Sequence, residues 1–582
     1  MSDEELAKDL GLVSAMTIGI GTMIGAGIFV LPGVAANAAG PIVVVSFVVG
    51  GLIAMVNALS VSELGTAMPK AGGGYYYINR SLGPMFGSIA GMGDWMGLAF
   101  ASAFYCIGFG QYLAVFVPLP EVAFLNPIQT GALLAGVVFV GVNLIGAKET
   151  GGVQNVIVFV LLSILTAFAL AGFLSFDYAT LAGEDGLAPF GTGAILPATA
   201  LVFVSFLGYA KIATVAEELK NPGRNLPIAI IGSVAIVTVI YAILVTTMLG
   251  VIPWPDLSLD APVAQAASAS FPSSIGPIGG VAAAAAAVMT GGALLATASS
   301  ANASILASAR INFAMGRDRI VTNWLNEIHP DYATPYRSIL LTGVLIVVFI
   351  AALGRDIAVL AKAASVLHLI VYALMNAALI VFRETDLPEY DPDFTVPLYP
   401  ITPLVGAVLS LGLVAFMDAL EIALSGGFVV AAVAWYFLYA RSRTSQGGVL
   451  SDYVRRREAD LPDRVVEAAD TVAPTGTEGP TIMVALANPR TETALVTLAG
   501  ALAQHEDGRV LATHVVTVPD QTALSAAAEN RDRIEASSED LLEAAKADAE
   551  AFDVPIETRT ILSHRAFDAV FDAARTNDAD TV

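Results

Sequence analysis

Apolar segments of about 20 residues recur along most of the chain, from Gly11 to about residue 440. A helix of about 20 apolar residues is long enough to cross the hydrocarbon core of a bilayer. Of the 582 residues, 56% are hydrophobic and only 14% are charged, which excludes an ordinary soluble protein. We therefore predict an all-α polytopic membrane protein. The first segment lacks the basic start of a signal peptide, so we expect it to remain in the mature protein.

Twelve spans follow from these segments, and the positions of Lys and Arg predict their orientation. Loops after even-numbered spans carry cations such as Lys70, Lys220 and Arg310, whereas Arg355 is the clear exception. Because cation-rich loops face the cytoplasm, both termini are predicted to be cytoplasmic in a multi-pass protein of the cell membrane. The predicted spans are residues 11–37, 41–66, 84–117, 128–146, 153–174, 193–216, 227–250, 276–306, 338–353, 357–382, 400–417 and 422–440.

Residue types that serve catalytic and metal sites are sparse. Cys106 is the only cysteine, which excludes an intrachain disulfide, and the five histidines lack metal-ligand spacing. The chain also lacks a P-loop, a nucleophile elbow and a paired-histidine zinc motif. We therefore predict no enzyme activity, no resident metal or cofactor and no nucleic-acid partner.

The chain is strongly acidic, with a net charge of −23. Residues 446–582 alone carry 25 acidic and 12 basic side chains. An acidic surface keeps a protein hydrated and dispersed where salt screens charge repulsion. A halophilic source is the hypothesis, and an ordinary acidic protein is the alternative.

Glycines crowd the middle of the first span, at Gly19, Gly21, Gly25 and Gly27. Each glycine costs about 1 kcal/mol relative to alanine inside a helix. A break at membrane depth leaves N–H and C=O groups that find no water, so it indicates a bound polar ligand. Close helix packing through small residues is the alternative. The sixth span has a similar interruption at Ser205 and Gly208, and breaks five spans apart fit an inverted five-plus-five repeat with a site near the midplane.

Three ordered motifs resemble the amino acid–polyamine–organocation (APC) superfamily of permeases, and its cationic amino acid transporter-like branch most. They are residues 24–29 (Ile-Gly-Ala-Gly-Ile-Phe), the stretch from Glu63 through residues 69–77 (Pro-Lys-Ala-Gly-Gly-Gly-Tyr-Tyr-Tyr), and the stretch from Gly208 through residues 217–227. Asn143 and Asn302 add support. The resemblance implies a LeuT-like fold, alternating access and an amino acid substrate.

Backbone groups at the two breaks suit a zwitterion. Unwinding after Met23 exposes N–H groups at a helix N-terminus, which favour a carboxylate. Unwinding in the sixth span frees carbonyls that suit an ammonium, and its apolar surroundings favour a neutral amino acid. The predicted substrate-binding residues are Met23, Gly25, Ala26, Gly27, Val204, Ser205 and Leu207.

Coupling residues are harder to identify. Lys211 is the only cation in the sixth span; it either contacts the substrate or ion, or snorkels toward the cytoplasm. Glu217 forms either a cytoplasmic gate or a solvated helix end, and Ser299 with Ser300 offers hydroxyls to Na⁺ or simply packs. Some proton-coupled relatives carry a lysine in the fifth span, and residues 152–163 have none. Coupling to Na⁺ or H⁺, exchange and uniport therefore stay open.

Beyond the spans, the pattern changes to a small α/β domain. Residues 441–478 are a predicted linker, in which Arg455 to Arg457 would contact anionic lipid. Strands at 481–487, 509–516 and 556–562 alternate with helices at 492–504, 521–551 and 566–575, which predicts a parallel sheet. This part resembles the universal stress protein domain, but it stops near a fourth strand, and Ala487 to Pro489 replaces the expected aspartate. Nucleotide binding is therefore unassigned, and regulation or homodimerisation is the hypothesis.

Together these features predict three parts: a permease domain at 1–440, a linker at 441–478 and an incomplete universal stress protein-like domain at 479–582. The predicted function is secondary transport of amino acids. The alternative is a sensor with the same site that binds an amino acid without moving it.

Overall fold

The computed structural model of the chain divides into two units: residues 8–474, here the membrane unit, and a second unit that includes residues 475–582, here the tail unit. The structure describes residues 10–581 except 71, 123, 147–150, 184–185, 276–277, 331, 333, 386, 388–389, 445–446, 458–461, 475–480, 487–488, 506–507, 518–541, 543–544, 547–553, 555, 564–565, 577–578 and 580.

The first half of the membrane unit is helical, with two irregular spans. Its elements are α1 Leu12–Met23, α2 Ala26–Phe29, α3 Leu31–Ala39, η1 Gly40–Ile42, α4 Val43–Ala67, α5 Gly73–Leu82, α6 Pro84–Phe116, α7 Pro127–Ile145, α8 Gly151–Leu174, α9 Tyr178–Ala182, η2 Thr192–Ala194, α10 Ile195–Val202, η3 Phe203–Tyr209, α11 Ala210–Ala213 and η4 Ala216–Glu218.

The second half continues with longer helices and one short hairpin. Its elements are α12 Pro222–Val251, η5 Trp254–Asp256, α13 Pro262–Ser270, β1 Ser274–Ile275, β2 Ile278–Gly279, α14 Val281–Arg317, η6 Asn323–Asn326, α15 Tyr336–Leu353, α16 Ile357–Glu384, α17 Ile401–Val414, α18 Ala419–Trp435, the π-helical turn η7 Tyr436–Ala440, α19 Val449–Arg456 and α20 Asp463–Val472.

Local sequence explains several helix ends. At α7, the Asn126 side chain accepts from the Gln129 N–H, and Gln129 bonds back to the Asn126 N–H, with Pro127 at the first position. This capping box satisfies donors that a helix start otherwise leaves without partners. The alanine-rich α14 has 37 residues, so it is about 56 Å long and exceeds the thickness of a hydrocarbon core.

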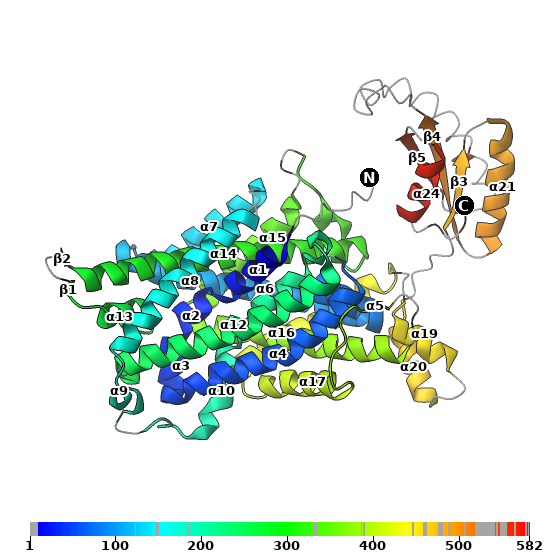
Figure 1. Cartoon of the computed structure of the whole chain (residues 1–582). Coiled ribbons are helices and arrows are strands. Elements are labelled where there is room, and N and C mark those ends of the chain that lie inside the picture. The colour runs from blue at the N-terminus through cyan, green and yellow to red at the C-terminus, as the bar shows by residue number, and fades with distance from the viewer. Residues whose placement is uncertain are drawn as a thin grey trace. The chain divides into compact units, whose positions relative to one another are not determined.

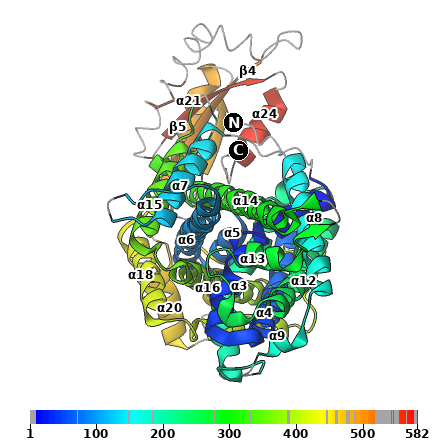
Figure 2. The same ribbon diagram turned by 90° about the vertical axis from the view of Figure 1, so that its left-hand side faces the viewer.

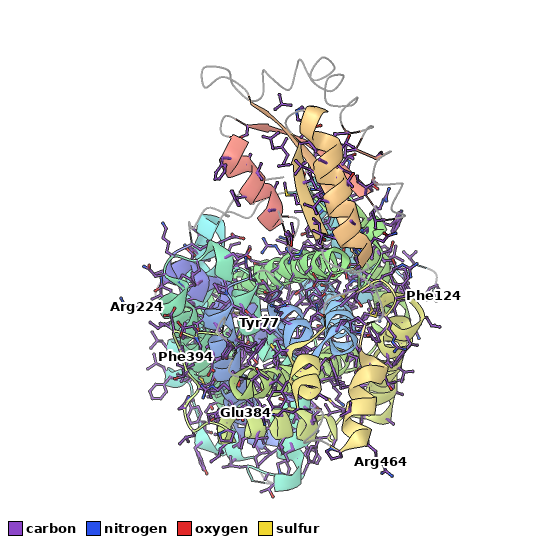
Figure 3. The ribbon with its side chains drawn as sticks, turned by 90° about the vertical axis from the view of Figure 1, so that its right-hand side faces the viewer. Tyr77, Phe124, Arg224, Glu384, Phe394 and Arg464 are labelled. Atoms are coloured by element: carbon purple, nitrogen blue, oxygen red, sulfur yellow. The ribbon has the colours of Figure 1, made fainter. Side chains whose placement is uncertain are left out.

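The helices pack around a central group. α6 packs against α14 and α16, and α4 packs against α12. In the end-on view, α14 and α16 lie between α7, α15 and α18 on one side and α8 and α12 on the other (Figure 2). The β1–β2 hairpin and α13 lie at one end of the unit, and α5, α19 and α20 lie at the other (Figure 1). Figure 3 faces this second end, with Tyr77 within the outline of the helices and Arg224 and Arg464 at the periphery.

Ten helices among the described residues are long and apolar enough to cross a membrane. The first predicted span is divided into α1, α2 and α3, and α17 has only 14 residues. The predicted linker is not bare chain, because α19 and α20 lie within it, and the Tyr436 hydroxyl donates to the Val472 carbonyl (2.6 Å).

The tail unit contains the predicted parallel sheet. Strands β3 Thr481–Leu486, β4 Arg509–Thr517 and β5 Ile556–Ser563 pair in that order, all parallel, with helices α21 Pro489–His505 and α24 Ala566–Thr576. The Met483 N–H also donates to the Thr581 carbonyl (2.8 Å), beside β3. Most of the acidic helix predicted at 521–551, and Ala487 and Asn488, lie outside the described residues.

Candidate functional site

The first span breaks where its glycines predict. α1 ends at Met23, the backbone turns at Ile24 (φ −76°, ψ 68°) and Gly25 (φ −116°, ψ −141°), and helix resumes at Ala26. The Gly25 N–H donates back to the Met23 carbonyl (2.8 Å), so this N–H is not free, contrary to our expectation. Ala26 and Gly27 begin α2, where the first N–H groups have no partner within the helix.

The sixth span tightens rather than unwinds, which corrects the expected geometry. Between α10 and α11, the seven residues of η3 form a 3-10 helix. In this form each carbonyl bonds three residues ahead, so the backbone stays largely paired in an apolar environment. Val204, Ser205 and Leu207 all lie in this buried stretch. A 3-10 segment inside a longer helix often marks a hinge.

One tyrosine joins the two breaks. The Tyr241 hydroxyl on α12 lies 2.6 Å from the Met23 carbonyl and 3.3 Å from the Ser205 carbonyl. The rings of Phe47 and Phe206 pack edge-on against Tyr241, which holds the phenol in place. This residue was not predicted from the sequence, although Tyr241 is the only aromatic residue of its span, which was an available signal.

A second tyrosine also reaches a carbonyl of the sixth span. The Tyr372 hydroxyl lies 3.5 Å from the Leu207 carbonyl. Thr22 Oγ1 lies 3.2 Å from the Gly208 carbonyl, but the Ile18 carbonyl of its own helix is nearer, at 2.7 Å. The carbonyls expected to be free at Ser205 and Leu207 are therefore partly occupied by hydroxyls from α12 and α16.

The two breaks touch at Gly27 and Ser205. A Cβ atom on Gly27 would lie 2.4 Å from Ser205 Oγ and 3.0 Å from its Cα, so only glycine permits this approach. Ser205 Oγ is buried and has no hydrogen-bond partner among the described residues. A buried hydroxyl of this kind normally finds a partner, which makes the junction a candidate for a polar ligand.

The two adjacent serines of α14 face different neighbours. Ser300 Oγ lies 3.5 Å from the Gly21 carbonyl, whereas Ser299 Oγ donates to Gln154 Oε1 on α8 (2.9 Å). Only Ser300 therefore faces the first span as the sodium hypothesis requires. No cluster of three or more His, Cys, Asp or Glu side chains suited to a metal occurs in the described part of the chain.

The Lys211 ammonium points across the bundle. It donates to Ser304 Oγ on α14 (2.8 Å) and lies 5.9 Å from the centroid of the Tyr105 ring on α6. This geometry differs from the snorkelling alternative. Glu217 lies in the partly exposed η4, where its neighbour Glu218 approaches Arg310 at 3.9 Å.

Other residues of the sequence motifs meet in pairs. Tyr75 and Asn79 on α5 both donate to Asp318 Oδ2, just beyond α14 (2.6 and 3.2 Å). Burial raises the pKa of the Asp318 carboxyl, while these hydrogen bonds oppose the shift. Asn143 Nδ2 likewise donates to Asn302 Oδ1 (2.6 Å). The motifs thus tie the ends and sides of spans together.

Comparisons with known proteins agree with this architecture. The amino acid permease family model matches residues 10–439, and the universal stress protein family model matches residues 480–582. The chain is 28% identical to the methylthioribose transporter and 27% identical to the branched-chain amino acid permease BcaP, both of Bacillus subtilis (strain 168), each over 76% of this chain and 95% of the relative. It is 29% identical to cationic amino acid transporter 7, chloroplastic, of Arabidopsis thaliana, over 67% of this chain and 68% of the relative.

These matches confirm the resemblance that the motifs indicated. The described residues form a multi-pass helical unit and a three-stranded parallel sheet, as such a chain requires. The chain therefore belongs to the amino acid permease family of the APC superfamily and carries a universal stress protein domain at its C-terminal end.

Proposed function

We propose that this chain is a secondary transporter that moves an amino acid across the cell membrane by alternating access. The observation that carries the proposal is the contact between the break in the first span, at Gly27, and the 3-10 segment of the sixth span, at Ser205, next to the Tyr241 bridge. A substrate bound there contacts both breaks at once, so a rearrangement of either one changes its exposure.

The proposed topology has twelve spans with both termini cytoplasmic. The ten long apolar helices include residues 31–67 as one helix. Counting α1–α3 and α4 as two spans and adding the shorter α17 gives twelve. Breaks in the first and sixth spans support an inverted repeat of five plus five spans. Proposed domain limits are 1–440, 441–478 and 479–582, and a regulatory role is proposed for the last.

The proposed site binds the groups that all amino acids share. The carboxylate accepts from the N–H groups of Ala26 and Gly27, next to Met23 and Gly25. The ammonium donates to the Ser205 carbonyl and hydroxyl. The side chain lies near Val204 and Leu207, which are buried and apolar, so a neutral aliphatic amino acid is the proposed substrate. The relative named as a branched-chain amino acid permease supports this choice.

Counterflow in proteoliposomes tests the proposal. Vesicles loaded with unlabelled L-leucine should accumulate tritiated L-leucine, and an excess of L-leucine should compete better than L-arginine or methylthioribose. Gly27→Leu should abolish accumulation, because its side chain would overlap Ser205. Gly141→Leu on α7 is the matched control, since a Cβ there meets nothing within 4 Å.

Two outcomes contradict the proposal. Exchange by Gly27→Leu at the wild-type rate would contradict the proposed position of the substrate site. If the wild type bound L-leucine without exchanging it, the sensor alternative would be favoured. Replacing Na⁺ by choline tests sodium coupling, for which Ser300 is the serine that faces the first span, whereas Ser299 bonds Gln154. Lys211 and Glu217 stay proposed coupling or gating residues.

A further inference from the structure

Two titratable side chains face each other in the interior of the membrane unit, away from the broken spans. Asp94 lies on α6, and His368 lies near the middle of α16. Their side chains are only 13% and 6% exposed, and Asp94 Oδ1 lies 4.0 Å from His368 Nε2. Ionisable residues inside a membrane are costly to bury and usually serve transport or proton transfer.

The hydrogen bond at the other ring nitrogen defines the tautomer of His368. Nδ1 lies 2.8 Å from the Ala364 carbonyl, which can only accept, so Nδ1 carries a hydrogen. In the neutral imidazole, Nε2 is then an acceptor and points toward a carboxylate that is also an acceptor. Without a further proton, two acceptor atoms, Asp94 Oδ1 and His368 Nε2, therefore face each other. One added proton, on either atom, makes that atom a donor to the other.

We propose that Asp94 and His368 form a proton-binding site that couples amino acid transport to the movement of H⁺. The inference rests on the proposed transport function. The loaded pair shares one proton and closes to hydrogen-bond distance; the empty pair holds two acceptors that repel each other. Binding and release of the proton therefore shift α6 relative to α16.

Other titratable and charged groups surround the pair. Lys211 is the cation whose charge acts on His368. Other titratable and charged groups on the elements packed around the pair include Glu63 on α4, Tyr75, Tyr76, Tyr77 and Arg80 on α5, Tyr105, Cys106 and Tyr112 on α6, Tyr209 in η3, Arg310 and Arg317 on α14, Tyr336 and Arg337 on α15, Lys362, Tyr372, Arg383 and Glu384 on α16, and Glu421 on α18.

A short path connects the pair to the sixth span. Tyr372 lies one turn after His368 on α16, so both face the same side of the helix. The Tyr372 ring stacks on Tyr209 with 5.4 Å between centroids, and its hydroxyl lies 3.5 Å from the Leu207 carbonyl. A movement of α16 at His368 is thereby transmitted to the 3-10 segment that carries Ser205.

Substitution of Gly97 displaces the His368 imidazole without removing any titratable group from the chain. A Cβ on Gly97 would lie 2.5 Å from His368 Cε1 and 2.6 Å from Nδ1. Gly93, one turn earlier on α6, is the matched control, because its Cβ would meet Val371 Cγ2 at an ordinary 3.5 Å. Both alanine substitutions favour the helix equally.

Infrared difference spectra of the purified full chain, recorded between acidic and alkaline buffer, test proton binding without a substrate. We expect a titrating carboxyl or imidazolium band that is lost in both Asp94→Asn and His368→Gln, because the two groups share one proton. Identical spectra for the wild type and both variants would overturn the proposal.

Uptake of tritiated L-leucine into proteoliposomes, with and without a pH gradient, tests coupling. For the wild type, the uptake rates with and without the pH gradient should differ by at least about fivefold, which is the lower end of typical coupling between sites. Asp94→Asn and Gly97→Ala should bring the ratio of the two rates to about one, and Gly93→Ala should retain the wild-type ratio. Comparing ratios removes differences in protein amount and in absolute rate.

The outcomes separate this proposal from the transport function. Wild-type exchange with a ratio of one, or an unchanged ratio in Asp94→Asn, would overturn proton coupling and leave transport standing. No exchange by the wild type would instead contradict the proposed function, and the infrared titration would then decide the proton site alone.

Discussion

Two buried carboxylates of the membrane unit have opposite surroundings. Glu63 on α4 has no exposed side-chain surface, and its oxygens accept from the Arg383 guanidinium, the Tyr390 hydroxyl and the Val396 N–H (2.6, 2.9 and 2.6 Å). Asp94 on α6 is nearly as buried, yet His368 at 4.0 Å is its nearest ionic partner among the described residues.

The difference separates a carboxylate that is fully hydrogen-bonded from one that lacks donors among the described residues. Four donated hydrogen bonds satisfy the Glu63 carboxylate and tie the end of α16 and the following loop to α4. Figure 3 labels Glu384 and Phe394, which belong to this region. Asp94 has a partner that becomes a donor only when a proton is added. Burial alone therefore does not indicate function, whereas unmet hydrogen bonding does.

The largest effect is expected from Arg383→Ala. It leaves the Glu63 charge buried without its main partner, which costs about 3–5 kcal/mol of folding free energy. The thermal unfolding midpoint of the detergent-solubilised protein should fall further than for substitutions of Tyr390, Asp94 or Lys362. An unchanged midpoint would mean that Glu63 does not rely on this pair.

Tyr390→Phe should have an intermediate effect. The variant removes one of several donors to Glu63, and a hydrogen bond to a charged group contributes about 1.5–3 kcal/mol. Tyr399→Phe is the matched control, because Tyr399 donates to the exposed Glu384 instead. Equal shifts of the unfolding midpoint in the two variants would contradict the special role of Glu63.

Asp94→Asn should change stability by less than about 1 kcal/mol. Asparagine preserves the volume, no hydrogen bond of the carboxylate is lost among the described residues, and the cost of a buried charge disappears. The measurement is again the unfolding midpoint. A loss as large as that of Arg383→Ala would make Asp94 structural and remove the contrast.

The smallest effect is expected from Lys362→Ala, also on α16. The Lys362 side chain is 17% exposed, but its partner Asp418 is 71% exposed and stays hydrated when the cation is removed, so the pair contributes about 0–1 kcal/mol. A small midpoint shift would show that the effect of Arg383→Ala comes from the buried partner rather than from losing any cation of this helix. A large shift would remove that distinction.

Features that depend on local sequence could be predicted. The break after Met23 follows from the glycines of one segment, and the three strands of the tail follow from short apolar runs between helical patterns. The family followed from motifs in chain order. Such signals lie within one element, so they do not require knowing how elements pack.

Features that depend on packing between distant elements could not be predicted from the sequence. The carbonyls of the sixth span contact Tyr241 and Tyr372, which come from other helices and are not adjacent in the sequence. The direction of Lys211 depends on Ser304, 93 residues away. Asp94 was recognisable as an unusual carboxylate in a span, but its partner His368 is identified only by the structure. The proposed roles of the substrate residues stay predictions.

The phenol of Tyr241 carries a single hydrogen, and two carbonyls compete for it. At 2.6 Å, Met23 holds that hydrogen, which leaves the Ser205 carbonyl, at 3.3 Å, as the acceptor with spare capacity. A ring rotation that favoured Ser205 would give the hydrogen to that carbonyl and leave the Met23 carbonyl accepting from the Gly25 N–H. The Tyr241 hydroxyl and a bound ammonium would therefore compete as donors to the carbonyl oxygens of Met23 and Ser205. While the hydroxyl lies between the two spans, one of these oxygens already accepts a hydrogen bond from it.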